Sequence, residues 1–275
     1  RRMMEVTRAT GTLGADVRGL DLSQPPDDEA VRSIRAALAE HLVLFFRDQQ
    51  PLDVEQHKAL VRRFGEPEVA PFQRDASDPE LLLLDQTDPR GSQAANFHAD
   101  NTFRPAPPMG AILQAHIVPD AGGDTCFASM YAAWDALSPR MQAYIEGLEA
   151  WHSLEQMAAR LASHGLKTSL KMDEWPPVRH PVVAVHPDTG RKLLNVNYNW
   201  TTQIADLPAA ESRAILAFLY EHIKSPEFQV RLRWQPGDIA FWDNRAVQHY
   251  AVPDWSGRRV MQRIAIAGEA APIPA

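Results

Sequence analysis

The feature that most constrains the fold is the distribution of apolar residues, which gather in runs of strand length. Such runs lie at 41–46, 110–118, 182–185, 192–196 and 260–267. Their length and composition are typical of strands in a folded core. Helical segments fall between them without a regular strand–helix–strand alternation, so a parallel α/β sheet is not indicated. The pattern predicts a mixed, β-rich fold, with a sandwich or barrel core surrounded by helices.

Helix signals occur in the segments between these runs. Asp27 begins a segment whose apolar residues recur at helical spacing, and a second helix is expected over 53–64, closed by Gly65. Ser138 is followed by proline, a pair that predicts a helix start. The segment 209–223 is expected to form a further amphipathic helix.

Two other segments are strand-like and contain a glycine. Residues 5–22 are expected to form short strands with a turn at Gly14. Residues 229–242 alternate hydrophobic and polar residues around Gly237, and His249 is expected just past this strand-like segment.

Composition limits the class of protein. With 275 residues, 45% hydrophobic and 23% charged, one globular domain over 1–275 is expected. The net charge of −7 argues against a nucleic-acid partner. The one cysteine, Cys126, can build neither a disulfide framework nor a thiolate metal cluster. Because no apolar run could span a bilayer and the first residues lack the apolar core of a secretory signal, we expect a cytoplasmic protein without a membrane partner.

A histidine and an aspartate two residues apart, His98 and Asp100, lie in the segment NFHADN. In extended chain such residues point to the same side, so both can reach one ion. His249, at the end of WDNRAVQH, supplies a second imidazole. Two imidazoles and a carboxylate on one face of an octahedron are the arrangement of non-haem Fe(II) oxygenases. The same groups can hold zinc with an open position, so a zinc-dependent hydrolase is the alternative.

The chain resembles the family of taurine dioxygenase and 2,4-dichlorophenoxyacetate dioxygenase, enzymes that depend on Fe(II) and 2-oxoglutarate. The resemblance covers nearly the whole chain and rests on long, ordered motifs. The matching stretches are GTLGADVRGLDLS (11–23), RRFGEP (62–67), FHADNTFRPAPP (97–108), GGDT (122–125), HPDTGRK (186–192), WQPGDIAFWDNRAVQHYA (234–251) and GRRVMQRIAIAG (257–268). It implies a double-stranded β-helix, or jelly-roll, core with surrounding helices.

The resemblance also implies a cofactor set and the residues that hold it. Iron is bound by His98, Asp100 and His249, with 2-oxoglutarate and O2 as cosubstrates. Arg259 is the cation for the far carboxylate of 2-oxoglutarate, because a guanidinium offers a two-pronged donor set, and Thr125 adds a hydroxyl. The gap from His249 to Arg259 is one residue shorter than is usual in the family, which a shortened turn at 254–257 explains.

The substrate pocket is where the sequence departs from taurine dioxygenase. Positions that grip taurine in that enzyme correspond here to Ala70, Gln73 and Ala94. Losing a sulfonate-binding histidine removes a charge-assisted hydrogen bond and opens space, so taurine itself is not expected to be the substrate. Gln73 is retained as a pocket candidate, together with Asn101 and Trp200.

A second arginine on the last strand-like run completes the predicted site. Arg263 follows Arg259 by four residues, so in a strand both side chains point the same way. By resemblance, Arg263 binds an anionic group of the primary substrate. We therefore expect hydroxylation of a small organic anion: a sulfonate, a sulfate ester, or an aryloxy or other carboxylate. Fragmentation of the hydroxylated product and a homo-oligomeric state, dimer or tetramer, are further expectations that the resemblance supplies.

Overall fold

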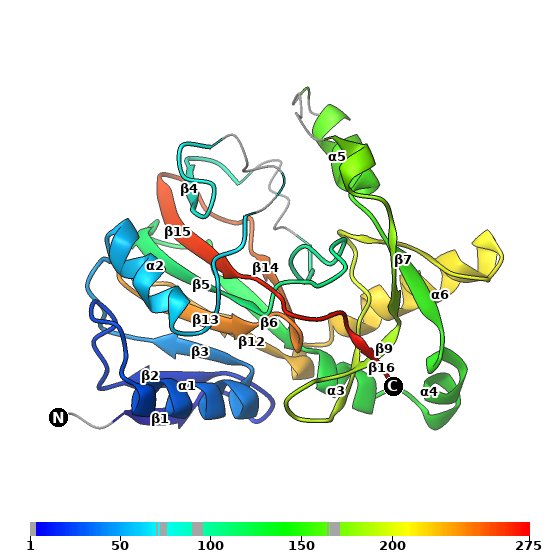
Figure 1. Cartoon of the computed structure of the whole chain (residues 1–275), viewed down its shortest axis with the longest axis horizontal. Helices are drawn as coiled ribbons and strands as arrows, with labels where there is room; N and C mark the ends of the chain where they lie inside the picture. Colours follow the sequence, from blue (N-terminus) through cyan, green and yellow to red (C-terminus); the bar gives the residue numbers. More distant parts are fainter. Residues whose placement is uncertain (1–3, 70, 72–75, 90–95, 164, 166–170) are drawn as a thin grey trace.

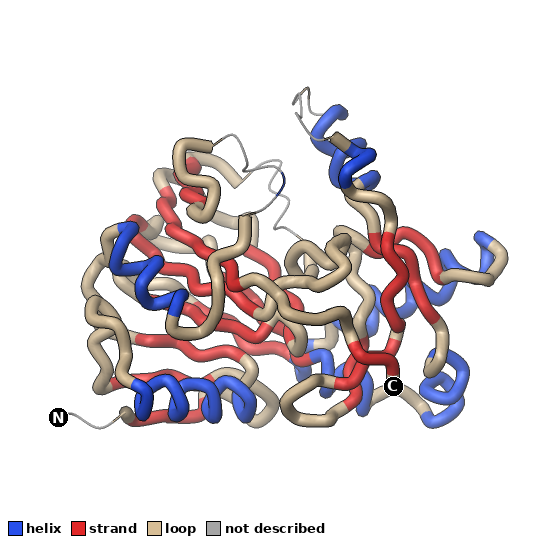
Figure 2. Tube along the Cα trace, in the orientation of Figure 1, coloured by secondary structure: helices blue, strands red, loops and turns tan. Residues whose placement is uncertain are grey.

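Two facing β-sheets form the centre of the structure, and helices cover the outside (Figure 1). This computed structural model describes residues 4–69, 71, 76–89, 96–163, 165 and 171–275. Figure 2 shows the strands concentrated in the middle of the molecule, with most helices at its periphery. None of the helices in these ranges is long and apolar enough to cross a membrane.

The larger sheet has seven strands and is antiparallel except where β2 pairs with β3. In spatial order its strands are β1 (Glu5–Arg8), β2 (Ala15–Arg18), β3 (Val43–Phe46), β13 (Ile239–Asp243), β5 (Gly110–Ile117), β15 (Arg259–Ile266) and β4 (Leu82–Gln86). Because β15 lies between β5 and β4, the strand that carries Arg259 and Arg263 is paired on both sides.

The smaller sheet lies against one face of the larger one. It consists of β12 (Gln229–Leu232), β6 (Thr125–Ser129) and β14 (Val247–Ala251). The ring of Phe127 on β6 lies 5.9 Å from Phe45 on β3 and 5.6 Å from Trp242 on β13. Two facing sheets with helices outside agree with the jelly-roll core that the resemblance implies.

Helices α1 (Asp28–His41) and α2 (Val54–Arg62) cover the other face of the larger sheet. The alternation of side chains along each strand explains this division, since neighbouring residues point to opposite faces. On β13, Trp242 belongs to the core between the sheets, whereas Phe241 packs toward the helices. The sequences of these strands are therefore continuous apolar runs, because both faces of the strands are buried.

The remaining elements form a second region beside these sheets, at the right of Figure 1. Its two three-stranded sheets are β10 (Lys192–Leu194), β9 (Val183–Val185) and β16 (Ile273–Pro274), and β11 (Thr201–Ile204), β7 (Glu149–His152) and β8 (Val178–Pro181). The other helices are α3 (Met130–Asp135), α4 (Pro139–Ile145), α5 (Glu155–Ser163), α6 (Ala209–Ile223), and the 3₁₀ helices η3 (Met172–Glu174) and η4 (Pro226–Phe228).

The helix starts that the sequence predicts are confirmed. Asp27 caps α1 by accepting the amide of Ala30 at 2.9 Å, and Ser138 caps α4. The strand-like segment 229–242 differs from expectation, since it contains two strands of different sheets, with Gly237 (φ 91°) between them. His249 lies within strand β14 rather than just past a strand, because its pairing partner β6 is distant in sequence.

Substitution of Phe241 tests the packing of the larger sheet against the helices. Its side chain is 1% exposed and meets Phe64 edge to face at 4.9 Å. We expect Phe241→Ala to lower the free energy of unfolding by about 3–5 kcal/mol in a urea titration, because it leaves a cavity in a closely packed core. Phe218, 45% exposed on α6, is the matched control. The packing account is contradicted if Phe241→Ala costs no more than Phe218→Ala, for which we expect less than about 1 kcal/mol.

Candidate active site

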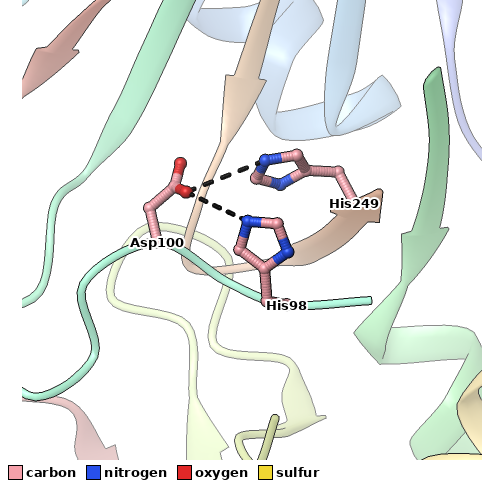
Figure 3. A group of neighbouring side chains, drawn as sticks. All are labelled: His98, Asp100 and His249. Atoms are coloured by element: carbon pink, nitrogen blue, oxygen red, sulfur yellow. Dashed lines mark ion pairs between the residues drawn. The ribbon is translucent and has the colours of Figure 1, made fainter. Parts of the chain in front are cut away.

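The three predicted metal ligands are brought together by a short antiparallel bridge (Figure 3). The amide of His98 donates to the carbonyl oxygen of His249 at 3.1 Å, and the amide of His249 donates back at 2.9 Å. Asp100 follows two residues after His98, in a turn. All three side chains are buried, and their potential ligand atoms lie within 4.8 Å of one another.

The spacing of these atoms fits a shared metal ion. Oδ1 of Asp100 lies 3.5 Å from Nε2 of His98 and 3.7 Å from Nε2 of His249. Both separations are long for hydrogen bonds. Ligand atoms that each stand about 2.1 Å from one ion lie roughly 3–3.5 Å apart. Within the described parts of the chain, this is the one cluster of His, Cys, Asp and Glu with such geometry.

The ionisation of these groups suits metal binding. Burial lowers the pKa of His249 to about 3, so its ring is neutral and offers a lone pair. Nδ1 of His98 donates to the carbonyl oxygen of Asn96 at 2.7 Å, which leaves Nε2 as the unprotonated nitrogen. Burial alone would raise the pKa of Asp100, but the adjacent Arg263 guanidinium lowers it below its ordinary value. The site therefore presents the neutral ring of His249, the Nε2 atom of His98 and a carboxylate.

A cavity of about 390 Å³ opens beside the triad. It contains most of the predicted site residues, which come from the segment 98–101, from β6, β14 and β15, and from the turn before β11. Those that line it are His98, Asp100, Asn101, Thr125, Trp200, His249, Arg259 and Arg263. The predicted candidate Gln73 lies outside the described residues, as do Ala70 and Ala94.

Arg259, on β15, and Thr125, on β6, both line this cavity. Arg259 is 5% exposed, and its Nη2 donates to the carbonyl oxygen of Gly123 at 3.2 Å. No carboxylate pairs with it in the described part of the chain, and burial lowers its pKa to about 10, so it stays charged at neutral pH. Thr125 accepts the indole N–H of Trp234 at 2.9 Å, which leaves the threonine O–H to donate elsewhere. The arrangement is suited to an anion.

The two glycines of the GGDT motif make room for this arrangement. Both have positive φ, 81° at Gly122 and 74° at Gly123. A Cβ at Gly122 would lie 2.6 Å from the carbonyl oxygen of Asp254, and one at Gly123 would lie 3.1 Å from Nε of Arg259. The motif thus lets the Arg259 side chain pack directly against the backbone before β6.

Arg263 projects into the cavity but also contacts a metal-ligand candidate. Its Nη2 lies 2.5 Å from Oδ2 of Asp100, the oxygen that faces away from the two histidines. The guanidinium stands 5.7 Å from the ring centroid of Trp242. Its Nε is buried without a hydrogen-bond partner in the described part of the chain. One donor of Arg263 therefore supports Asp100, while the residue also lines the cavity.

Asn101 and Trp200 line the cavity and are also tied into the protein. Asn101 donates to Oε2 of Glu68 at 3.0 Å. Trp200 donates its indole N–H to the carbonyl oxygen of Ala99 at 3.0 Å and packs on Phe103 at 4.8 Å. Trp200 therefore belongs both to the buried core and to the wall of the cavity.

Sequence reasoning missed two buried polar residues at the site. Glu68 lines the cavity, paired with Arg104 at 2.9 Å, and burial raises its pKa, although Arg104 opposes that shift. Asn244 hydrogen-bonds the backbone of Asp100. Glu68 directly follows the motif stretch RRFGEP, and Asn244 lies within WQPGDIAFWDNRAVQHYA. Their partners are distant in sequence, so no local pattern identifies these contacts.

Comparison with known proteins places this site in a family. The family described as "Taurine catabolism dioxygenase TauD, TfdA family" matches residues 5–265. An alpha-ketoglutarate-dependent sulfate ester dioxygenase of Pseudomonas putida is 35% identical over 276 residues, covering 97% of this chain and 90% of that protein. A (S)-phenoxypropionate/alpha-ketoglutarate-dioxygenase of Sphingobium herbicidovorans is 35% identical over 280 residues, covering 97% and 96%.

Solved structures agree with the fold. The crystal structure of AAD-2 in complex with Mn(II) and N-oxalylglycine superposes with a TM-score of 0.84 at 30% identity, covering 98% of this chain and 100% of that one. The expected jelly-roll class is thereby confirmed, and the relatives support the dioxygenase and not the zinc hydrolase alternative. The chain belongs to the TauD/TfdA family and is an Fe(II)- and 2-oxoglutarate-dependent dioxygenase.

Proposed function

We propose that this dioxygenase hydroxylates an organic anion with an apolar body, held beside an iron bound by His98, Asp100 and His249. The observation that carries the proposal is the shared cavity, where Arg263 and a set of apolar side chains stand next to the triad. In this assignment Arg259 and Thr125 hold the far carboxylate of 2-oxoglutarate. Arg263, Asn101 and Trp200 face the primary substrate, and Gln73, which lies outside the described residues, is assigned to substrate binding as well.

When bound, Fe(II) with 2-oxoglutarate and O2 supplies the oxidising power that an unactivated C–H bond requires. The protein's own groups position the reactants. Arg259 offers its guanidinium to one end of the cosubstrate, which fixes the direction in which the keto acid end points. Arg263 and the apolar wall hold the substrate so that one carbon faces the triad. Burial of these groups excludes water and strengthens their electrostatic interactions.

Strand β4 and helix α5 contribute to the apolar wall of the cavity. Leu82 and Leu84 line the cavity from β4, and Met157 lines it from α5. Leu82 is the direct cross-strand partner of Arg263, so the carbons next to a bound anionic group would lie against it. These contacts favour a sulfate ester, sulfonate or aryloxy carboxylate with a sizeable apolar part. Hydroxylation beside the ester or ether oxygen gives an unstable adduct that fragments, and we include this step in the proposal.

The setting of the enzyme is also part of the proposal. We place it in the cytoplasm as one domain per chain and as a homo-oligomer, a dimer or tetramer. Cys126, the one cysteine of the chain, is buried in β6, which fits a reducing compartment. Light scattering during size-exclusion chromatography measures the oligomeric state, and a monomer at micromolar concentration would contradict that part.

Replacement of Arg263 tests the anion site. We expect Arg263→Ala to raise KM for the organic substrate about 10- to 100-fold at saturating Fe(II), because charge-assisted hydrogen bonds contribute about 1.5–3 kcal/mol. KM is obtained from succinate release with alkyl sulfates and aryloxy acids. Arg258→Ala is the control, since Arg258 is exposed and pairs with Asp85 outside the cavity. An unchanged KM in Arg263→Ala for every turned-over substrate would show that Arg263 does not bind the anion.

Replacement of Leu82 tests the apolar wall. We expect Leu82→Asn to lower kcat/KM about 5- to 30-fold for alkyl sulfates of eight or more carbons, because about 1–2 kcal/mol of apolar contact is lost. The effect should shrink as the alkyl chain is shortened. Leu83→Asn is the matched control, since Leu83 is 54% exposed on the opposite face of β4. An equal loss of kcat/KM in the two variants would show that Leu82 on β4 does not contact the substrate.

A further inference from the structure

The side chain of Asn244 satisfies the backbone of a metal-ligand candidate. Its Oδ1 accepts the amide of Asp100 at 2.8 Å, and its Nδ2 donates to the carbonyl oxygen of Asp100 at 3.0 Å. Nδ2 also donates to the carbonyl oxygen of Pro108 at 3.2 Å, so both amide hydrogens are used. Asn244 is 4% exposed, which shields these bonds from water.

The backbone at Asp100 needs such a partner because the chain has left the strand. His98 is fixed by its two hydrogen bonds to His249, but Asp100 lies in a turn. The next residue, Asn101, has a positive φ of 49°, which breaks any extended course. The amide of Asn244 offers one acceptor and one donor to a single residue, as a neighbouring strand would. It thus continues the bridge at a point where no strand runs.

Asn244 is itself held in a rigid turn between β13 and β14. Its backbone amide donates to the carbonyl oxygen of Met109 at 2.9 Å. The preceding carboxylate, Asp243, accepts from Nε2 of His186 at 2.7 Å and from Nε of Arg245 at 2.9 Å. The same turn leads directly into β14, which carries His249. Through Asn244, this turn therefore fixes the position of Asp100 relative to His249.

We infer that Asn244 is a positioning residue of the iron site, which holds Asp100 where its carboxylate meets the two imidazoles. The residue does not contact the metal position itself; it acts through the backbone of Asp100. Removing its amide frees the turn at Asp100 to shift, while the His98–His249 bridge stays in place. The affinity for the metal should then fall, in addition to any loss of stability. Removing a group that orients a metal ligand typically lowers metal affinity about 10- to 100-fold.

The test compares Asn244→Ala with a buried amide that plays no part in the site. Gln114 is fully buried and likewise bonds three backbone groups, accepting the amide of Leu52 at 2.8 Å and donating to the carbonyl oxygens of Gln50 at 2.9 Å and Gly237 at 3.0 Å. We therefore expect Gln114→Ala to lose about as much stability as Asn244→Ala. Anaerobic calorimetric titration with Fe(II) alone gives the dissociation constant, and Mn(II) gives a second readout through the rise in Tm.

We expect Asn244→Ala to bind Fe(II) at least about 10-fold more weakly than the wild type and to show a smaller Mn(II)-induced rise in Tm. Gln114→Ala should keep the wild-type dissociation constant although its Tm without metal falls. If Asn244→Ala does not fold, Asn244→Leu replaces it, because leucine has a similar volume but can neither accept the amide of Asp100 nor donate to its carbonyl oxygen. Wild-type affinity in the folded Asn244 variant, or an equal loss in Gln114→Ala, overturns the inference.

Discussion

Two backbone hydrogen bonds between His98 and His249 are the contact on which the site depends. Residues that lie directly opposite in an antiparallel pair project their side chains to the same face, which brings the two rings to 4.4 Å between centroids. Asp100 then reaches the same point from two residues further along the chain. The bridge joins segments that are remote in sequence, so the triad exists only once the smaller sheet has formed.

Charged side chains beside this bridge determine the electrostatics of the cavity. Arg259 and Arg263 enter from a single strand, four residues apart, and bring two positive charges into a largely buried space. Asp100 and Glu68 bring negative charge close to Arg263, whereas Arg259 has no such partner within the described residues. The Arg259 end is therefore the stronger anion site, which agrees with a dianionic cosubstrate there and a substrate with an apolar body at the other end.

The sequence was informative where structure depends on near neighbours. The cap at Asp27 and the capping box of Asp53 use partners three residues away, so the starts of α1 and α2 were predictable. Strands β4, β6 and β14 were not identified, because each is defined by a distant partner and not by its own pattern. The triad and both arginines were predicted through long motifs, and the structure brings them together. Glu68 and Asn244 were not identified, because their contacts at the site are tertiary and no local pattern contains them.

In the proposed site, the triad holds Fe(II) while Arg259 holds 2-oxoglutarate in the same cavity. Anaerobic absorption spectroscopy of the protein with Fe(II), followed by addition of 2-oxoglutarate, measures this directly. We expect a visible metal-to-ligand charge-transfer band in the wild type, and a weaker band at the same cosubstrate concentration in Arg259→Ala. Absence of the band from folded, iron-loaded wild-type protein would contradict the account, and an equal band in Arg259→Ala would contradict the role of Arg259.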